Sequence, residues 1–251
     1  MTNSRNNTGN TDPGQPGNDA RAIKVTLYAS NAFPLDSKTF GTRQELCDWI
    51  RSWPDDNGGA FFRIKGADLS GEDFSGKNFD NVELVGCNLS NASFKNCRMD
   101  KTNLSRSKMH KTDFSGSSMD GASLNKTDMA GVRLDNCVLT GANFAHAKAP
   151  GASFVGANMT NATAQRAVFS GADMRDASLK TSVLASCDLT HTDLRGADLT
   201  GANVMYANLM HAQITAEQVA TTLGSAVFTP ATGAGKLSGM ARKRRPPAPG
   251  R

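Results

Sequence analysis

The cysteines and histidines are the side chains of this sequence that could hold a metal ion or act as nucleophiles. A zinc site usually takes its ligands in close pairs, such as two Cys separated by two to four residues. The nearest two of the five Cys are Cys87 and Cys97, ten residues apart, and the four His are spaced more widely still. The sequence shows no Gly-rich phosphate loop and no nucleophile elbow. We therefore expect no catalytic residue, no metal site and no cofactor.

Charged residues are the other candidates for a functional surface. The 251 residues include 28 Lys and Arg and 23 Asp and Glu, but residues 64–214 hold fifteen of each sign, and the positive excess lies in residues 215–251. A charge run is most often a solvated face, and the alternative is contact with an anionic partner. The candidate anionic-contact surface, here called the basic band, consists of Lys95, Arg98, Lys101, Arg106, Lys108 and Lys111. The candidate tail signal consists of Arg242, Lys243, Arg244 and Arg245.

A five-residue repeat must position these side chains. From Leu69 to Leu209 every fifth residue is Leu, Phe or Met in 26 of 29 positions, and the residue two before it is small in 27, the exceptions being Glu72 and Lys77. A period of five would scatter the large residues around an α-helix and would place them on alternating sides of a flat strand. The period predicts a chain that turns a corner every five residues and points the large and the small side chain inward. Gly and Asn, which tolerate φ > 0, are frequent at the expected corners.

Tandem copies such as Ala67-Asp68-Leu69-Ser70-Gly71 and Ala197-Asp198-Leu199-Thr200-Gly201 resemble the pentapeptide-repeat family. The resemblance implies an all-β fold over residues 64–214, a right-handed quadrilateral β-helix with twenty residues per coil, called the shaft below. Residues twenty apart then stack, so we expect a ladder of phenylalanines along one side. The small inward positions include four cysteines, which we expect to fill the core: Cys87, Cys97, Cys137 and Cys187.

The residues before the repeat divide into two segments. Residues 1–19 are mostly small and polar and are predicted to be a disordered leader. Residues 20–63 are predicted to form a small α/β cap, with a strand over 23–28 and a helix opened by a capping box of Thr42 and Glu45.

Two further segments follow the repeat. Thr215 and Gln218 form a second capping box, which predicts a helix over 215–228 with Val219, Leu223 and Val227 on one face. Residues 229–251 are predicted to be a disordered basic tail. Because the ends of a β-helix are open strand edges, we expect both terminal elements to cover them. We favour a monomer with the C-terminal helix as a plug, and a homodimer through this helix is the alternative.

The order of a polar leader, a small domain and a repeat is similar to that of type III secreted pentapeptide-repeat effectors. We therefore expect a non-enzymatic protein–protein interaction scaffold, specifically a secreted bacterial effector acting on host components. One alternative is a DNA-mimicking protein that binds gyrase or topoisomerase, although such a rod should be acidic and this shaft is neutral. Another alternative is a cytoplasmic bacterial scaffold of unknown partner.

Localisation follows from the same features. No stretch approaches the roughly 20 apolar residues of a membrane span, and the start lacks the apolar run of a signal peptide. We expect the bacterial cytoplasm, with secretion into a host cell under the effector interpretation. Contact with a membrane surface or a nucleic acid through the basic band or the tail is a further alternative that we do not favour.

Overall fold

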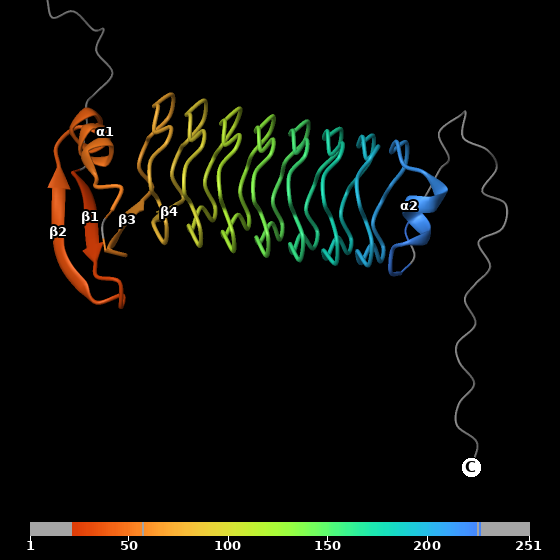
Figure 1. Cartoon of the computed structure of the whole chain (residues 1–251). Coiled ribbons are helices and arrows are strands. Elements are labelled where there is room, and N and C mark those ends of the chain that lie inside the picture. Colours follow the sequence, from red (N-terminus) through yellow and green to blue (C-terminus); the bar gives the residue numbers. More distant parts are fainter. Residues whose placement is uncertain (1–21, 57, 225, 227–251) are drawn as a thin grey trace, which may run out of the picture.

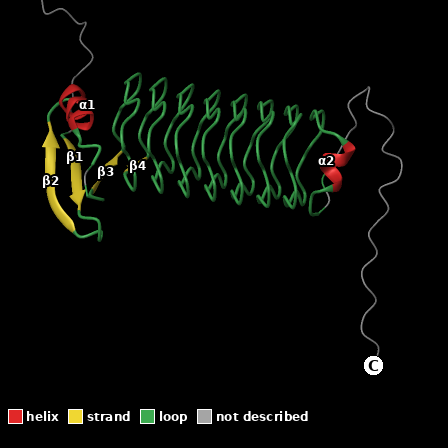
Figure 2. Ribbon diagram, in the orientation of Figure 1, coloured by secondary structure: helices red, strands yellow, loops and turns green. Residues whose placement is uncertain are grey.

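A computed structural model describes residues 22–56, 58–224 and 226. In the described part of the chain a four-stranded sheet and a helix lie at one end of a long stack of coils, and a short second helix lies at the other end (Figure 1, Figure 2). In chain order the elements are β1 (Ile23–Tyr28), β2 (Pro34–Phe40), α1 (Arg43–Ser52), β3 (Phe61–Lys65), β4 (Glu83–Val85) and α2 (Ala216–Ala220).

The shaft is a parallel β-helix with twenty residues in each coil. Parallel bridges join residues twenty apart, from Asp68 with Asn88 to Asp193 with Gln213, and each coil contributes four of them. These four bridges confirm the expected four-sided coil. We number the faces one to four by the large inward residues of the first coils: Phe74, Phe79, Leu84 and Leu89 mark faces one, two, three and four.

Each face ends at a corner with a left-handed backbone. At all 29 positions two residues after a large one, φ lies between +53° and +76°. The amides of most of these corner residues donate to a carbonyl of the next coil, as Arg106 does to Asn125 (3.1 Å). The expected corners are therefore confirmed, and residues other than Gly and Asn adopt the left-handed conformation at many of them.

The core runs without a break from the cap into the shaft. Ring centroids are 5.1 Å apart for Trp49 and Phe62, and 6.2 Å apart for Phe62 and Phe79. Further along, Phe94 and Phe114 stack at 5.3 Å. The expected aromatic ladder is thus confirmed, and all large inward residues of the shaft are buried.

The cap sheet continues into face three of the shaft. Its strand order is β2-β1-β3-β4, with antiparallel pairing on both sides of β1 and parallel pairing of β3 with β4. The domain boundary expected between residues 63 and 64 falls inside β3, so the cap and the shaft share a sheet. The sequence did not predict β2, because this edge strand begins with Pro34 and carries Asp, Ser and Lys, which have weak strand propensity.

Helix α1 begins as expected and docks on the first coil. The Thr42 hydroxyl accepts from the Glu45 amide (3.2 Å), but the Glu45 carboxylate accepts from the Gly41 amide, so the capping box is half formed. Arg43 and Arg51 of α1 both pair with Glu72, at 2.6 Å for Arg43.

Lys77, the other residue that breaks the small-residue pattern, lies 3.5 Å from the Asp55 carboxylate of the cap. The two exceptions to the repeat, Glu72 and Lys77, therefore both form ion pairs with the cap.

The C-terminal helix is shorter than expected. The capping box of Thr215 and Gln218 is present, and the Gln218 amide donates to the carbonyls of Leu194 (2.7 Å) and Ala197 (2.8 Å) at the last coil. The expectation that Leu223 shares a helix face with Val219 is wrong. Leu223 instead pairs with Asn203. Its amide donates to the Ala202 carbonyl at 2.7 Å, and this pairing continues the hydrogen-bonded ladder of face three. Val227 lies outside the described residues.

Candidate functional site

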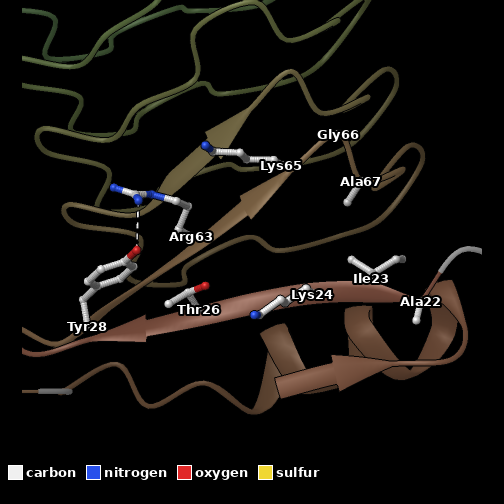
Figure 3. Close-up of a pocket in the computed structure, with 9 residues that line it drawn as sticks. All are labelled: Ala22, Ile23, Lys24, Thr26, Tyr28, Arg63, Lys65, Gly66 and Ala67. Atoms are coloured by element: carbon white, nitrogen blue, oxygen red, sulfur yellow. Dashed lines mark hydrogen bonds between the residues drawn. The ribbon is translucent and has the colours of Figure 1, made fainter. Parts of the chain in front are cut away.

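A hollow with cationic walls lies where the cap sheet meets the shaft (Figure 3). Arg63 is held by three hydrogen bonds: Nε and Nη2 donate to the Glu83 carboxylate at 2.5 Å each, and Nη1 donates to the Tyr28 hydroxyl at 2.8 Å. The hydrogen bonds that Arg63 donates to the Glu83 carboxylate raise the pKa of Arg63. The exposed ammonium groups of Lys24 and Lys65 flank this triad. The hollow can accept an anionic group, and Arg63 is already neutralised by Glu83.

The basic band wraps around the shaft. Lys95 and Arg98 contact acidic neighbours, at 3.1 Å from Asp113 and 2.6 Å from Asp80 respectively. The other four are exposed and form no ion pair with any described residue. By position in the coil, the six lie as follows: Lys95 after face one, Arg98 on face two, Lys101 after face two, Arg106 after face three, Lys108 on face four and Lys111 after face four. Residues close in sequence thus point in different directions, and the role of the band as an anionic-contact surface stays a prediction.

A different set of basic residues shares one corner, the one between faces three and four. We call these the basic row: Arg106, Lys126, His146 and Arg166. All four side chains are exposed, and none forms an ion pair with a described residue. The row does not stand out in the sequence, because its members are twenty residues apart. Reading every twentieth residue at the corner positions would have found it.

The neutral shaft also separates its charges between its sides. The repeats of faces one and two hold eleven acidic and eight basic residues, whereas those of faces three and four, including Lys65, hold four acidic and seven basic. The corner after face three carries no Asp or Glu from residue 65 to residue 206. The shaft as a whole is neutral, but the corner after face three is positive, because basic residues stack along it without acidic ones.

The cysteines of the described residues are buried, whereas the histidines lie on the surface. Burial raises the pKa of the Cys87 and Cys97 thiols to about 11 and of the Cys137 and Cys187 thiols to about 12. These four face the core as expected, and Cys47 is buried in the cap.

The histidines are exposed, and the described residues contain no group of three or more His, Cys, Asp or Glu placed to hold a metal ion. Among the described helices, none is long and apolar enough to cross a membrane. The candidate tail signal, Arg242 to Arg245, and the leader over 1–19 lie outside the described residues.

Comparison with family models gives matches over most of the shaft. A model described as a pentapeptide repeat region matches residues 63–144 and 87–163, and one described as pentapeptide repeats (8 copies) matches residues 177–215. Together they cover more than half of the chain. No curated protein matches the sequence.

Several solved structures are similar to this chain. HetL, a pentapeptide repeat protein involved in heterocyst differentiation regulation from the cyanobacterium Nostoc sp. strain PCC 7120, is 21% identical with a TM-score of 0.40, over 65% of this chain and 86% of HetL. A pentapeptide repeat protein from the Arabidopsis thaliana thylakoid lumen is 26% identical with a TM-score of 0.35, over 45% and 66%. QnrB1, a plasmid-mediated fluoroquinolone resistance protein, is 19% identical with a TM-score of 0.34, over 66% and 91%.

Proposed function

Because the chain belongs to the pentapeptide-repeat family, we propose that it is a non-enzymatic scaffold whose right-handed shaft binds a protein partner on its outer surface. The observation that carries this proposal is the filled core. The large inward side chains of the shaft are buried from Leu69 to Leu209, so the described part of the chain presents its chemistry on the outside. Outward positions hold mostly polar and charged residues.

The continuous sheet supports a role that depends on rigidity. The hydrogen-bonded ladder runs from β1 through β3 and β4 and then along face three, and α1 is tied to the first coil through Glu72. A partner bound at the cap and a second contact on the shaft would therefore be held in fixed orientation. A monomer with α2 as a plug is part of the proposal, since Gln218 donates to carbonyls of the last coil and Val219 is buried.

The test is to block the faces of the full-length protein one at a time. Ser123→Arg with Asn143→Arg places two large side chains on face three, and Asn158→Arg with Ser178→Arg does the same on face two as a matched control. Arg98 and Arg133 already occupy equivalent outward positions, so the fold accommodates Arg there. Partner proteins are captured from cells by crosslinking and quantified. We expect a block on one face to remove a partner that the other blocks retain, and capture that is insensitive to blocks on all four faces would refute a shaft-binding scaffold.

The narrower form of the proposal is an effector delivered into a host cell. It is supported by the polar composition of residues 1–19 ahead of the cap and repeat. Fusing this leader to a reporter and measuring type III translocation tests it, and a reporter that stays in the bacterium would remove the effector role while leaving the scaffold intact.

The alternative of a DNA-mimicking gyrase or topoisomerase ligand draws its support from the rod shape and from the acidic side formed by faces one and two. Inhibition or protection of gyrase supercoiling at stoichiometric protein would favour this alternative.

A further inference from the structure

We propose that the basic row binds single-stranded nucleic acid, with its cations on successive phosphates. This goes beyond a protein-binding scaffold, because the ligand is a polyanion and the surface is one corner of the shaft. The row consists of Arg106, Lys126, His146 and Arg166, as defined above.

The row is straight because the coils stack in register. Each member donates its amide to the next coil, as Lys126 does to Ala145 (3.0 Å) and Arg166 does to Ala185 (3.1 Å). At a strand spacing of about 4.8 Å, the span from Arg106 to Arg166 is roughly 14 Å. The geometry is thus a line of exposed polar side chains at regular intervals, with the formal cations at Arg106, Lys126 and Arg166, which suits a flexible chain of evenly spaced negative charges.

The surroundings of the row leave its charge uncompensated. On face four, Lys108 and Lys148 are exposed beside it, and Asp128, which lies between them in the column, instead contacts His110 at 2.9 Å. On the other side, the outward residues of face three are neutral hydrogen-bonding groups: Asn103, Ser123, Asn143 and Thr163. This contrasts with Lys95 and Arg98 of the basic band, whose charges are offset by Asp113 and Asp80.

The backbone at the row adds a second observation. Arg106, Lys126 and Arg166 have φ of 61°, 59° and 59°, a left-handed conformation that is strained for residues with a side chain. Glycine fills the equivalent corner position elsewhere, for example at Gly66 and Gly86 of the same column. The row therefore keeps long cationic side chains at positions that also accept glycine, as Lys101 and Lys111 do at other corners.

An aromatic side chain points to a single strand rather than to a duplex. Tyr206 is 74% exposed and occupies the same corner two coils beyond Arg166. An exposed ring can stack on a base whose face is free, and base faces are hidden inside a duplex. A flat lipid surface could also lie along this straight corner, so a membrane is kept as one arm of the test below.

A matched pair of double variants tests the proposal in the full-length protein. Lys126→Gly with Arg166→Gly removes two charges from the row, and Lys101→Gly with Lys111→Gly removes two charges from other corners. All four positions have positive φ and no ion pair with a described residue, so both variants make the same change in charge and in backbone. Glycine is favoured at each site, so neither variant loses the fold. Both also retain residues 242–245 of the tail.

Binding is measured by fluorescence anisotropy with labelled oligo(dT) of about 20 nucleotides at about 50 mM salt. We expect the row variant to bind at least about tenfold more weakly than the wild type, and its log–log salt dependence to fall by roughly 1.4, which corresponds to two phosphate contacts on a single strand. The control variant should bind within about twofold of the wild type. Equal losses in the two variants, or no loss in either, would overturn the proposal.

Tyr206→Gly separates the single strand from other polyanions. We expect about tenfold weaker binding to oligo(dT) and unchanged binding to inorganic polyphosphate, because the latter has no base to stack. Vesicles containing phosphatidylserine provide the membrane arm. If the row variant affects vesicle binding and leaves oligo(dT) binding unchanged, the row is a lipid-binding surface and the proposal fails.

Discussion

Exchanging glycine with other residues at two corners tests the left-handed backbone on which the whole shaft depends. Lys126 has φ of 59° and Gly141 has φ of 65°, and a Cβ added at Gly141 would meet no atom within 4 Å. The left-handed conformation costs an L-residue about 1–2 kcal/mol. Glycine recovers that strain but loses about 0.5–1 kcal/mol through the greater freedom of its unfolded chain. We therefore expect Lys126→Gly to stabilise the protein by about 0.5–1 kcal/mol and Gly141→Ala to destabilise it by a similar amount.

The assay is equilibrium unfolding in urea, with the variants compared through their midpoints at a shared slope. Ala145→Gly is the matched control, because Ala145 precedes a corner and lies outside the positive-φ positions. Glycine there should destabilise the protein by about 0.5–1 kcal/mol, opposite in sign to Lys126→Gly. If Gly141→Ala raised the stability, as a Gly→Ala change does at ordinary φ, the corner assignment would be refuted.

Three further predictions concern the core, the thiols and the acid limb of stability. Leu124 is 0% exposed, so Leu124→Lys should destabilise the protein by more than about 4 kcal/mol and unfold the shaft. Asn125→Lys should change the stability by less than about 0.5 kcal/mol. Equal thermal melts of the two variants, followed by circular dichroism, would contradict the inward assignment of Leu124. Because burial raises the pKa of the four shaft thiols to about 11 or 12, a thiol reagent at neutral pH should label them only in denaturant, and rapid labelling of the native protein would show that the coils open. The Thr200 hydroxyl and amide hold the pKa of Asp198 at about 2, below its unfolded value near 3.8, so its contribution is present above about pH 4 and is lost as the pH falls toward 2. In the Asp198→Asn variant the thermal midpoint should therefore fall less steeply with decreasing pH over that range. A pH profile of the midpoint identical to that of the wild type would contradict this prediction.

The repeat was predictable from the sequence because its cause is local. A large residue, a corner and a small residue recur within five positions, so the inward set, the buried cysteines and the stacked phenylalanines all follow from short-range spacing. The repeat also contains its own exceptions, Glu72 and Lys77. Their meaning could not be predicted, because their partners Arg43, Arg51 and Asp55 lie in a cap whose docking is a tertiary event.

The ends of the chain were less predictable for a physical reason. Both capping-box sequences correctly located a helix start, since an N-cap is a local hydrogen bond. The length of the second helix was not local: Leu223 could extend α2 or pair with the last coil, and the open edge at Ala202 and Val204 offered two backbone hydrogen bonds. Pairing with an open strand edge thus competes with helix formation, and here Leu223 pairs with the edge of the last coil instead of extending α2.

The corners and the stacking of the coils determine where a binding surface can form on this fold. Neighbours in sequence point in directions that change at every corner, so a charge run such as the basic band is divided among faces and its members meet different partners. Neighbours in space are twenty residues apart, and a column keeps one direction for the length of the shaft. A single substitution therefore alters one position on a surface, while the members of a column such as Arg106 to Arg166 all face the same side of the shaft. Function on this shaft should consequently respond to charge changes placed at intervals of twenty residues and resist equal changes placed within one coil, whatever the net charge of the protein.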